Sequence, residues 1–155
     1  MTITGPAAPI LVHATAIAID GRAVLLRGPS GAGKSDLALR LIDSGALLVA
    51  DDQVELRRAG ERVLVTAPAA IAGLIEVRGV GILCIEAVAE ATLASLVDLV
   101  PSAEVDRLPE ARCEDVLGVA VPLIALSPFE ASAAAKLRLA LSAFSADSMP
   151  AIIRR

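Results

Sequence analysis

The chain has 155 residues, 55% of them hydrophobic, which is the size of one domain; we predict a single domain over residues 1–155 with its core at about 11–145. The formal net charge of −4 argues against a nucleic-acid partner, because proteins that bind nucleic acid are normally basic. Two cysteines and one histidine are too few for a disulfide framework or a zinc cluster, and no uncharged apolar stretch is long enough to span a membrane, so we predict a protein of the reducing cytoplasm.

The first predicted elements are two antiparallel strands. Residues 11–19 read as one strand, and the hairpin signal Asp20-Gly21 joins it to a second strand over residues 23–27. His13 lies in the first of these strands between apolar neighbours. A lone histidine in such a position is more often a satisfied core residue than a catalyst.

The second strand leads into a glycine-rich segment, residues 28–35, which we call the phosphate loop because it fits the pattern G-x-x-x-x-G-K-[ST] at every fixed position. Glycines let backbone N–H groups turn toward phosphate oxygens, Lys34 adds a positive charge near the terminal phosphates, and Ser35 can hold Mg²⁺ through its hydroxyl. Apolar residues in the next segment predict a helix that ends before Gly45 and directs its positive end at the anion. The motif therefore predicts a nucleotide or polyphosphate ligand, bound by Gly28, Pro29, Ser30, Gly31, Ala32, Gly33, Lys34 and Ser35.

A pair of aspartates follows the next predicted strand. Residues 47–50 form a short apolar run suited to a buried parallel strand, and Asp51 and Asp52 come directly after it. In open α/β sheets, ligands gather at this end of the strands. One carboxylate could hold Mg²⁺ through water and the other could accept a proton from an attacking hydroxyl. The alternative is a solvated turn in which aspartate accepts backbone hydrogen bonds.

Residues 53–58 and 61–67 are predicted as a hairpin, residues 68–73 as a turn or short helix, and residues 74–85 as an apolar run that is unusual for a plain strand because it holds two charges and two glycines. On an extended chain Glu76 and Arg78 would face the same way. Glu76 could complete the Mg²⁺ shell and Arg78 could pair with it or with phosphate, whereas a surface ion pair is the alternative.

The rest of the chain carries fewer signals. We predict strand or helix for residues 92–100, loop for 101–115, strand for 116–126, helix from Pro128 to about 144, and a loose end over 151–155.

Four segments together resemble the catalytic domain of HPr kinase/phosphorylase, in the same order and at near-identical spacing: residues 11–13, the phosphate loop, residues 48–54 and residues 75–82. The resemblance runs from about residue 11 to residue 126. It implies an α/β fold with a phosphate-loop core of mixed sheet and flanking helices, similar to phosphoenolpyruvate carboxykinase, in a hexameric assembly. It also implies a kinase that uses ATP and Mg²⁺ to phosphorylate a serine of HPr, the phosphocarrier of the bacterial sugar phosphotransferase system, and that reverses the reaction by phosphorolysis.

The same resemblance implies roles for individual residues. Lys34 would contact the transferring phosphoryl group, and Asp52 would accept the proton of the substrate serine in the forward direction. His13 matches a histidine near that carboxylate, and Glu76 matches a Mg²⁺ ligand. The expected catalytic residues are thus His13, Lys34, Asp52 and Arg78, and the expected metal ligands are Ser35, Asp51 and Glu76.

The sequence departs from the family pattern in two places. Longer members carry an N-terminal domain, whereas this chain begins close to the matching histidine and resembles a short form with the catalytic domain alone. Members also carry arginines in a stretch that enters the last helix, but the corresponding residues 127–133 contain none, and Lys136 and Arg138 follow one turn later. This loss weakens the expectation of phosphorolysis and of phosphate binding more than that of kinase activity.

The sequence therefore predicts a protein serine kinase of the HPr kinase type. Two alternatives stay open at this level. One is a kinase that uses the same loop to phosphorylate a small metabolite, and the other is a regulatory module that binds ATP without transferring phosphate. Either ATP or pyrophosphate remains possible as the phosphate donor.

Overall fold

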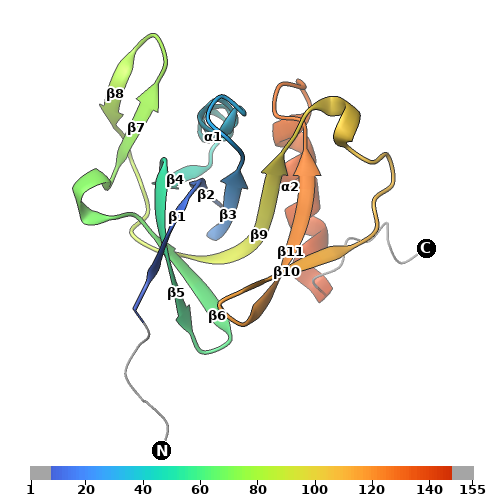
Figure 1. Cartoon of the computed structure of the whole chain (residues 1–155). Coiled ribbons are helices and arrows are strands. Elements are labelled where there is room, and N and C mark those ends of the chain that lie inside the picture. The colour runs from blue at the N-terminus through green and yellow to red at the C-terminus, as the bar shows by residue number, and fades with distance from the viewer. Residues whose placement is uncertain (1–7, 148–155) are drawn as a thin grey trace, which may run out of the picture.

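The computed structural model describes residues 8–147, which form a curled mixed sheet, a separate hairpin and two α-helices (Figure 1). The helices are α1 (Lys34–Asp43) and α2 (Ala133–Asp147), and short 3₁₀ turns lie at Ala69–Ile71 and Ser102–Glu104. The strands are β1 (Ile10–His13), β2 (Thr15–Ile19), β3 (Arg22–Arg27), β4 (Leu47–Ala50), β5 (Gln53–Ala59), β6 (Arg62–Thr66), β7 (Leu74–Val77), β8 (Gly81–Cys84), β9 (Ala91–Leu99), β10 (Arg112–Val116) and β11 (Val119–Leu126). The predicted α/β class is confirmed.

The main sheet is ordered β1-β5-β6-β9-β3-β2-β4, and β11 and β10 continue it beside β9. Two strands pair with different parts of one edge of β9. It pairs with β6 near its start, at Ala91 and Thr92, and with β11 near its end, from Leu96 to Leu99. Along its other edge it pairs with β3, and β3, β9 and β11 run parallel. Their carboxyl ends therefore open at the same edge of the sheet.

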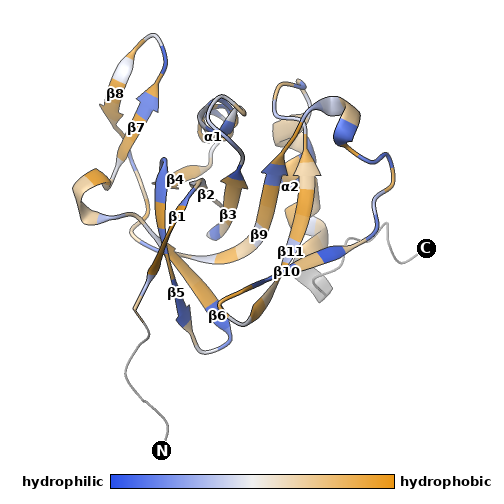
Figure 2. Ribbon diagram, viewed as in Figure 1, coloured by the Kyte–Doolittle hydropathy of each residue, from blue (hydrophilic) through white to orange (hydrophobic). Residues whose placement is uncertain are grey.

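The central strands are buried on both faces, because successive side chains of a strand point to opposite sides. Ile17 and Leu26 pack on one face with Leu37 of α1 and Leu141 of α2. The small side chains Ala16, Ala18 and Ala23 lie on the other face, in one cluster with Val54 and Val65. Figure 2 shows the result: the central strands are largely hydrophobic, and polar positions gather in turns and at strand ends.

Two predictions about the first half of the sheet are corrected. Residues 11–19 are not one strand, because the chain changes partner at Ala14: β1 pairs with β5, and β2 pairs with β3 and β4. Strand β4 is antiparallel to its neighbour rather than parallel. The crossover through α1 makes β4 run in the same direction as β3. In the sheet, however, β4 pairs with β2, and the Asp20-Gly21 hairpin makes β2 antiparallel to β3.

Further corrections fall in the second half. Residues 74–85 fold into the β7–β8 hairpin, and Arg78 lies in its turn rather than on the extended strand that carries Glu76. Gly79 and Gly81 have φ of 88° and 127°, a backbone that suits a tight turn. The predicted loop 101–115 contains the start of β10, and α2 begins at Ala133. The segment 92–100, predicted as strand or helix, is strand β9, which ends at Leu99.

Residues 151–155, predicted as loose, lie outside the described part of the chain. Within residues 8–147, neither helix has the length and apolar character needed to cross a lipid bilayer.

Candidate active site

The phosphate loop joins β3 to α1, in the order that its sequence motif requires. The amide of Ala32 donates to the carbonyl of Pro29 at 2.9 Å, which closes the loop into a turn. Gly31 and Gly33 have φ of 83° and 100°, in the left-handed region that favours glycine, and Gly33 is the residue directly before α1. The first turn of α1 therefore faces the space that the loop surrounds.

Lys34 is almost completely buried at the base of this loop, with 8% of its surface exposed. Its Nζ donates to the carbonyl of Gly28 at 2.5 Å and to that of Pro29 at 3.1 Å. Both carbonyls belong to the loop, so the ammonium group lies where a phosphate bound by the loop would meet it. Burial strengthens its electrostatic interactions, because the surrounding dielectric constant is lower than that of water.

Asp51 connects the phosphate loop to two other elements. The residue is 7% exposed, and its Oδ1 accepts hydrogen bonds from Ser35 Oγ at 3.2 Å and from Thr15 Oγ1 at 3.1 Å. Its Oδ2 accepts a hydrogen bond from the backbone amide of Glu76 at 3.1 Å. A buried carboxylate needs such partners to offset the loss of water. Thr15 was not among the predicted site residues, because it stands in an otherwise apolar strand.

Asp52 points away from that buried cluster and is exposed, with a side-chain exposure of 71%. Its φ of 72° is unusual for a residue other than glycine. The backbone carbonyl of Asp52 accepts a hydrogen bond from the amide of Ala14 at 3.2 Å, and its Oδ1 lies 2.8 Å from Nε2 of His13. Two residues that are 39 positions apart in the sequence are thereby held side by side.

Lys34, Asp51 and Asp52 border one cavity of about 450 Å³. Its polar lining residues are Lys34, Ser35, Asp51, Asp52 and Glu76, and its remaining lining is Thr15, Gln53, Ile71, Leu74 and Ile82. The cavity is large enough for a small ligand such as a nucleotide phosphate group. Polar groups from the loop, the aspartate pair and the β7–β8 hairpin therefore converge on one space.

The predicted metal ligands suit a magnesium ion in their chemistry. Ser35, Asp51 and Glu76 offer a hydroxyl and two carboxylates, and Mg²⁺ prefers oxygen ligands. Among residues 8–147, no group of three or more His, Cys, Asp or Glu side chains is placed to hold a metal ion by itself. Mg²⁺ usually keeps several waters and shares phosphate oxygens, so a partial protein shell fits this ion.

Three cations considered at the sequence level lie elsewhere. Arg78 is exposed in the β7–β8 turn and is not among the residues that line the cavity. Lys136 forms an ion pair with Glu130 at 2.8 Å. Arg138 donates from Nη2 to Ser44 Oγ at 2.7 Å and to the carbonyl of Leu41, and so caps the far end of α1. The last two therefore do not supply the cation that is missing from residues 127–133.

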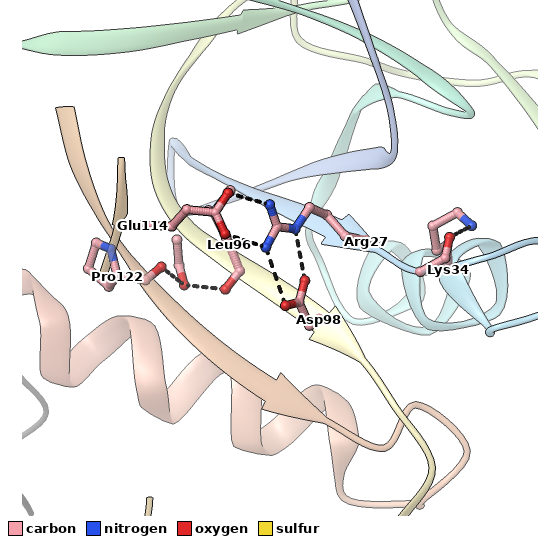
Figure 3. A network of polar contacts seen from close by, with 8 residues as sticks. Arg27, Lys34, Leu96, Asp98, Glu114 and Pro122 are labelled. Atoms are coloured by element: carbon pink, nitrogen blue, oxygen red, sulfur yellow. Dashed lines mark hydrogen bonds and ion pairs between the residues drawn. The ribbon is translucent and has the colours of Figure 1, made fainter. Parts of the chain in front are cut away.

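A polar network that the sequence did not reveal holds the strand entering the phosphate loop (Figure 3). Arg27, the last residue of β3, donates from Nε to Asp98 Oδ1 of β9 at 2.8 Å. Its Nη1 and Nη2 donate to the two carboxylate oxygens of Glu114 on β10, at 2.7 and 2.9 Å. Such a two-pronged arginine–carboxylate pair is geometrically specific. The network therefore fixes three strands relative to one another directly before Gly28.

Replacing Glu114 by glutamine is expected to destabilise the fold at neutral pH and to matter less in acid. The hydrogen bond from Arg27 lowers the pKa of the Glu114 carboxyl in the folded chain. A carboxyl with a lowered folded pKa stabilises the fold above its unfolded pKa, and this contribution is lost as the pH falls through the folded value. Because the pair is partly exposed, we expect a modest effect.

Urea unfolding of the wild type and of Glu114→Gln at neutral and acid pH measures this difference. Glu104→Gln, at an exposed glutamate outside the network, is the matched control. A difference in unfolding free energy that is the same at both pH values would contradict the role given to the ionised carboxylate.

Comparison with known proteins gives consistent matches. The family model described as HPr Serine kinase C-terminal domain matches residues 6–137. A protein of Caldicellulosiruptor bescii named HPr kinase/phosphorylase is 51% identical over 72 residues, which are 46% of this chain and 23% of that protein. A protein of the same name from Peptoclostridium acidaminophilum is 43% identical over 112 residues, which are 70% of this chain and 36% of that protein.

A solved structure matches as well. The HPr(Ser) kinase/phosphatase from Coxiella burnetii superimposes with a TM-score of 0.70 at 31% sequence identity, over 76% of this chain and 79% of that chain. This likeness supports the mixed α/β fold described above. The matched part of the chain spans only about a quarter to a third of the length of these two curated relatives.

Proposed function

The chain belongs to the HPr serine kinase C-terminal domain family, and on that basis we propose that it transfers a phosphoryl group from ATP to a serine of the phosphocarrier protein HPr. The observation that carries the proposal is the convergence at one cavity of the buried Lys34 ammonium and the exposed Asp52 carboxylate. The first suits a bound phosphate and the second suits an incoming hydroxyl. The names of the curated relatives and of the solved structure support the same activity.

In the proposed reaction, the serine oxygen attacks the terminal phosphorus of ATP while the bond to ADP breaks on the opposite side. Lys34 and the backbone amides of the phosphate loop offset the negative charge of the phosphoryl group. Asp52 orients the serine hydroxyl and accepts its proton, and His13, 2.8 Å from Asp52 Oδ1, holds that carboxylate in place.

We propose Mg²⁺ as the metal cofactor, held by Ser35, Asp51 and Glu76. When bound, it would neutralise charge on the phosphate oxygens of ATP. The Ser35 hydroxyl and the Glu76 backbone amide donate to Asp51, which keeps the three proposed ligands close together. Arg78 stays a proposed catalytic residue: it lies in the turn of the hairpin that carries Glu76, so it would have to approach the cavity from there.

We extend the proposal to the oligomeric state of the enzyme, its cellular location and the reverse reaction. The exposed side chains of Val80 and Ile82 on the β7–β8 hairpin favour self-association, and the family resemblance suggests a hexamer. Cys84 and Cys113 are free and exposed, which agrees with a reducing cytoplasm, where ATP is also supplied. Phosphorolysis of the phosphorylated product is the less supported direction, since residues 127–133 lack an arginine.

A transfer assay tests the proposal directly. The purified chain is incubated with HPr, Mg²⁺ and ATP labelled on its terminal phosphate, and the expected result is label on a serine of HPr. HPr with its serines replaced by alanine is the control substrate. Label that appears only on a small metabolite would favour the small-molecule kinase, and ATP binding without any transfer would favour the regulatory module. Either outcome would contradict the proposed function.

A further inference from the structure

We propose that Phe129 stacks against the base of the bound nucleotide and so makes the site selective for a nucleoside triphosphate over an inorganic polyphosphate. This inference rests on the proposed function, because it takes the phosphate loop as the binding site for ATP. It adds a residue that lies outside the phosphate-loop motif. It also assigns a binding residue to the base, for which the sequence predicted none.

The sheet order places Phe129 on the correct side of the loop. The relevant strands lie in the order β4, β2, β3, β9 and β11, with the phosphate loop after β3. Asp51 and Asp52 follow β4 on one side, and residues 127–130 follow β11 on the other. A triphosphate with its terminal phosphoryl group toward Asp52 must extend its nucleoside in the opposite direction. That direction leads across the loop toward the residues after β11.

Phe129 touches the phosphate loop and is nevertheless open to solvent. A methyl group placed on Gly33 would lie 3.0 Å from Cζ of Phe129 and 2.9 Å from Cγ of Pro128. Phe129 is 68% exposed, whereas Phe144, the other phenylalanine of the chain, is buried in the core. An aromatic ring can stack on a base of any type through its flat face. The ring is therefore adjacent to the loop and still has surface free for a ligand.

The backbone on both sides of Phe129 is anchored, so the ring sits on a firm support. Arg40 of α1 donates from Nη1 to the carbonyl of Glu130 at 3.2 Å and from Nη2 to the carbonyl of Pro128. The Glu130 carboxylate is in turn held by Lys136 at 2.8 Å and by Ser102 Oγ at 3.1 Å. A preorganised support lowers the entropic cost of binding a ligand.

The chemistry of this turn also favours a base over a phosphate. Residues 127–132 contain no lysine or arginine, and the neighbouring cations Arg40 and Lys136 are engaged in the contacts just described. The turn therefore presents an aromatic face without a spare positive charge. A neutral, planar base is the part of ATP that such a surface would recognise.

Binding of Mg-ATP and of magnesium tripolyphosphate, measured by calorimetry, tests this inference. Phe129→Ala is expected to raise the Kd for ATP by roughly 5- to 150-fold, the range seen when a stacking aromatic is removed, and to leave the Kd for tripolyphosphate unchanged within about twofold. Phe129→Leu keeps apolar bulk against Gly33 but lacks a flat ring, so it should behave like the alanine variant. Phe129→Tyr should bind ATP like the wild type.

Leu139→Ala, at a leucine of α2 that is 72% exposed, is the matched control for loss of a surface apolar group. If Phe129→Leu raised the Kd for ATP and for tripolyphosphate equally, the ring would only support the loop. If it left the Kd for ATP unchanged, the ring would not contact the base. Either result overturns the inference. A wild-type chain that binds neither ligand would instead overturn the proposed function, so the two failures are distinguishable.

Discussion

Replacing Lys34 by alanine is expected to lower the rate of phosphoryl transfer at saturating ATP by at least about a hundredfold, the scale seen when one donor to a developing anionic charge is removed. The large effect follows from position: the ammonium is buried within the loop and is bonded to the carbonyls of Gly28 and Pro29. Water cannot easily replace its charge there. The Kd for ATP should rise as well, since the same charge contacts the phosphates before reaction.

Single-turnover transfer to HPr measures this loss, and thermal unfolding shows whether the variant is folded. Arg62→Ala is the matched control, because it removes an exposed cation from the β5–β6 hairpin, which lies far from the loop in Figure 1. A Lys34→Ala protein that is folded and transfers phosphate near the wild-type rate would contradict the assignment of this lysine to the phosphoryl group.

Replacing Asp52 by asparagine is expected to lower transfer by about 10²- to 10⁴-fold, the usual contribution of a general base, while ATP binding is retained. The amide has nearly the same shape as the carboxylate but cannot accept the serine proton. The backbone should be unaffected, because asparagine tolerates the left-handed conformation that Asp52 adopts with φ of 72°. This separation of transfer from binding is the signature of a base.

The chain provides a close control for this variant. Asp20 is also exposed and also left-handed, with φ of 51°, but it lies in the β2–β3 turn. Asp20→Asn should therefore leave transfer unchanged. ATP affinity is compared by calorimetry and transfer by label on HPr. If Asp52→Asn phosphorylated HPr as the wild type does, another group would have to be the base.

The sequence predicted those parts of the fold that local signals determine. The Asp20-Gly21 hairpin is confirmed, and so is the order of strand, loop and helix around Lys34, because turn residues, a fixed motif and a helical apolar pattern lie within a few positions of one another. The pairing of strands depended on distant contacts. Nothing local shows that the chain changes partner at Ala14 or that Arg112 begins a strand beside β11.

The candidate site was likewise predictable only in part. His13 and Asp52 were associated through a family resemblance, and the structure places them in contact. Thr15 and Arg27 were missed, because the role of each becomes apparent only from a hydrogen-bond partner that is distant in the sequence. Arg27 and Glu114, for example, are 87 positions apart. Arg40 was missed for another reason: four residues after Asp36 on a helix, it looks like half of an ordinary surface ion pair.

The two neighbouring aspartates differ in how mutations at them should be interpreted. Asp51 receives hydrogen bonds from a strand, from the helix after the phosphate loop and from the β7–β8 hairpin, so it supports the architecture as well as facing the cavity. An inactive variant at that position would leave open whether chemistry or folding had failed. Among residues 8–147, the side chain of Asp52 is hydrogen-bonded only to the exposed His13, so a defect there reports mainly on chemistry. Genetic screens that score activity without measuring protein abundance would treat both positions as equivalent, although only one of them gives an unambiguous result.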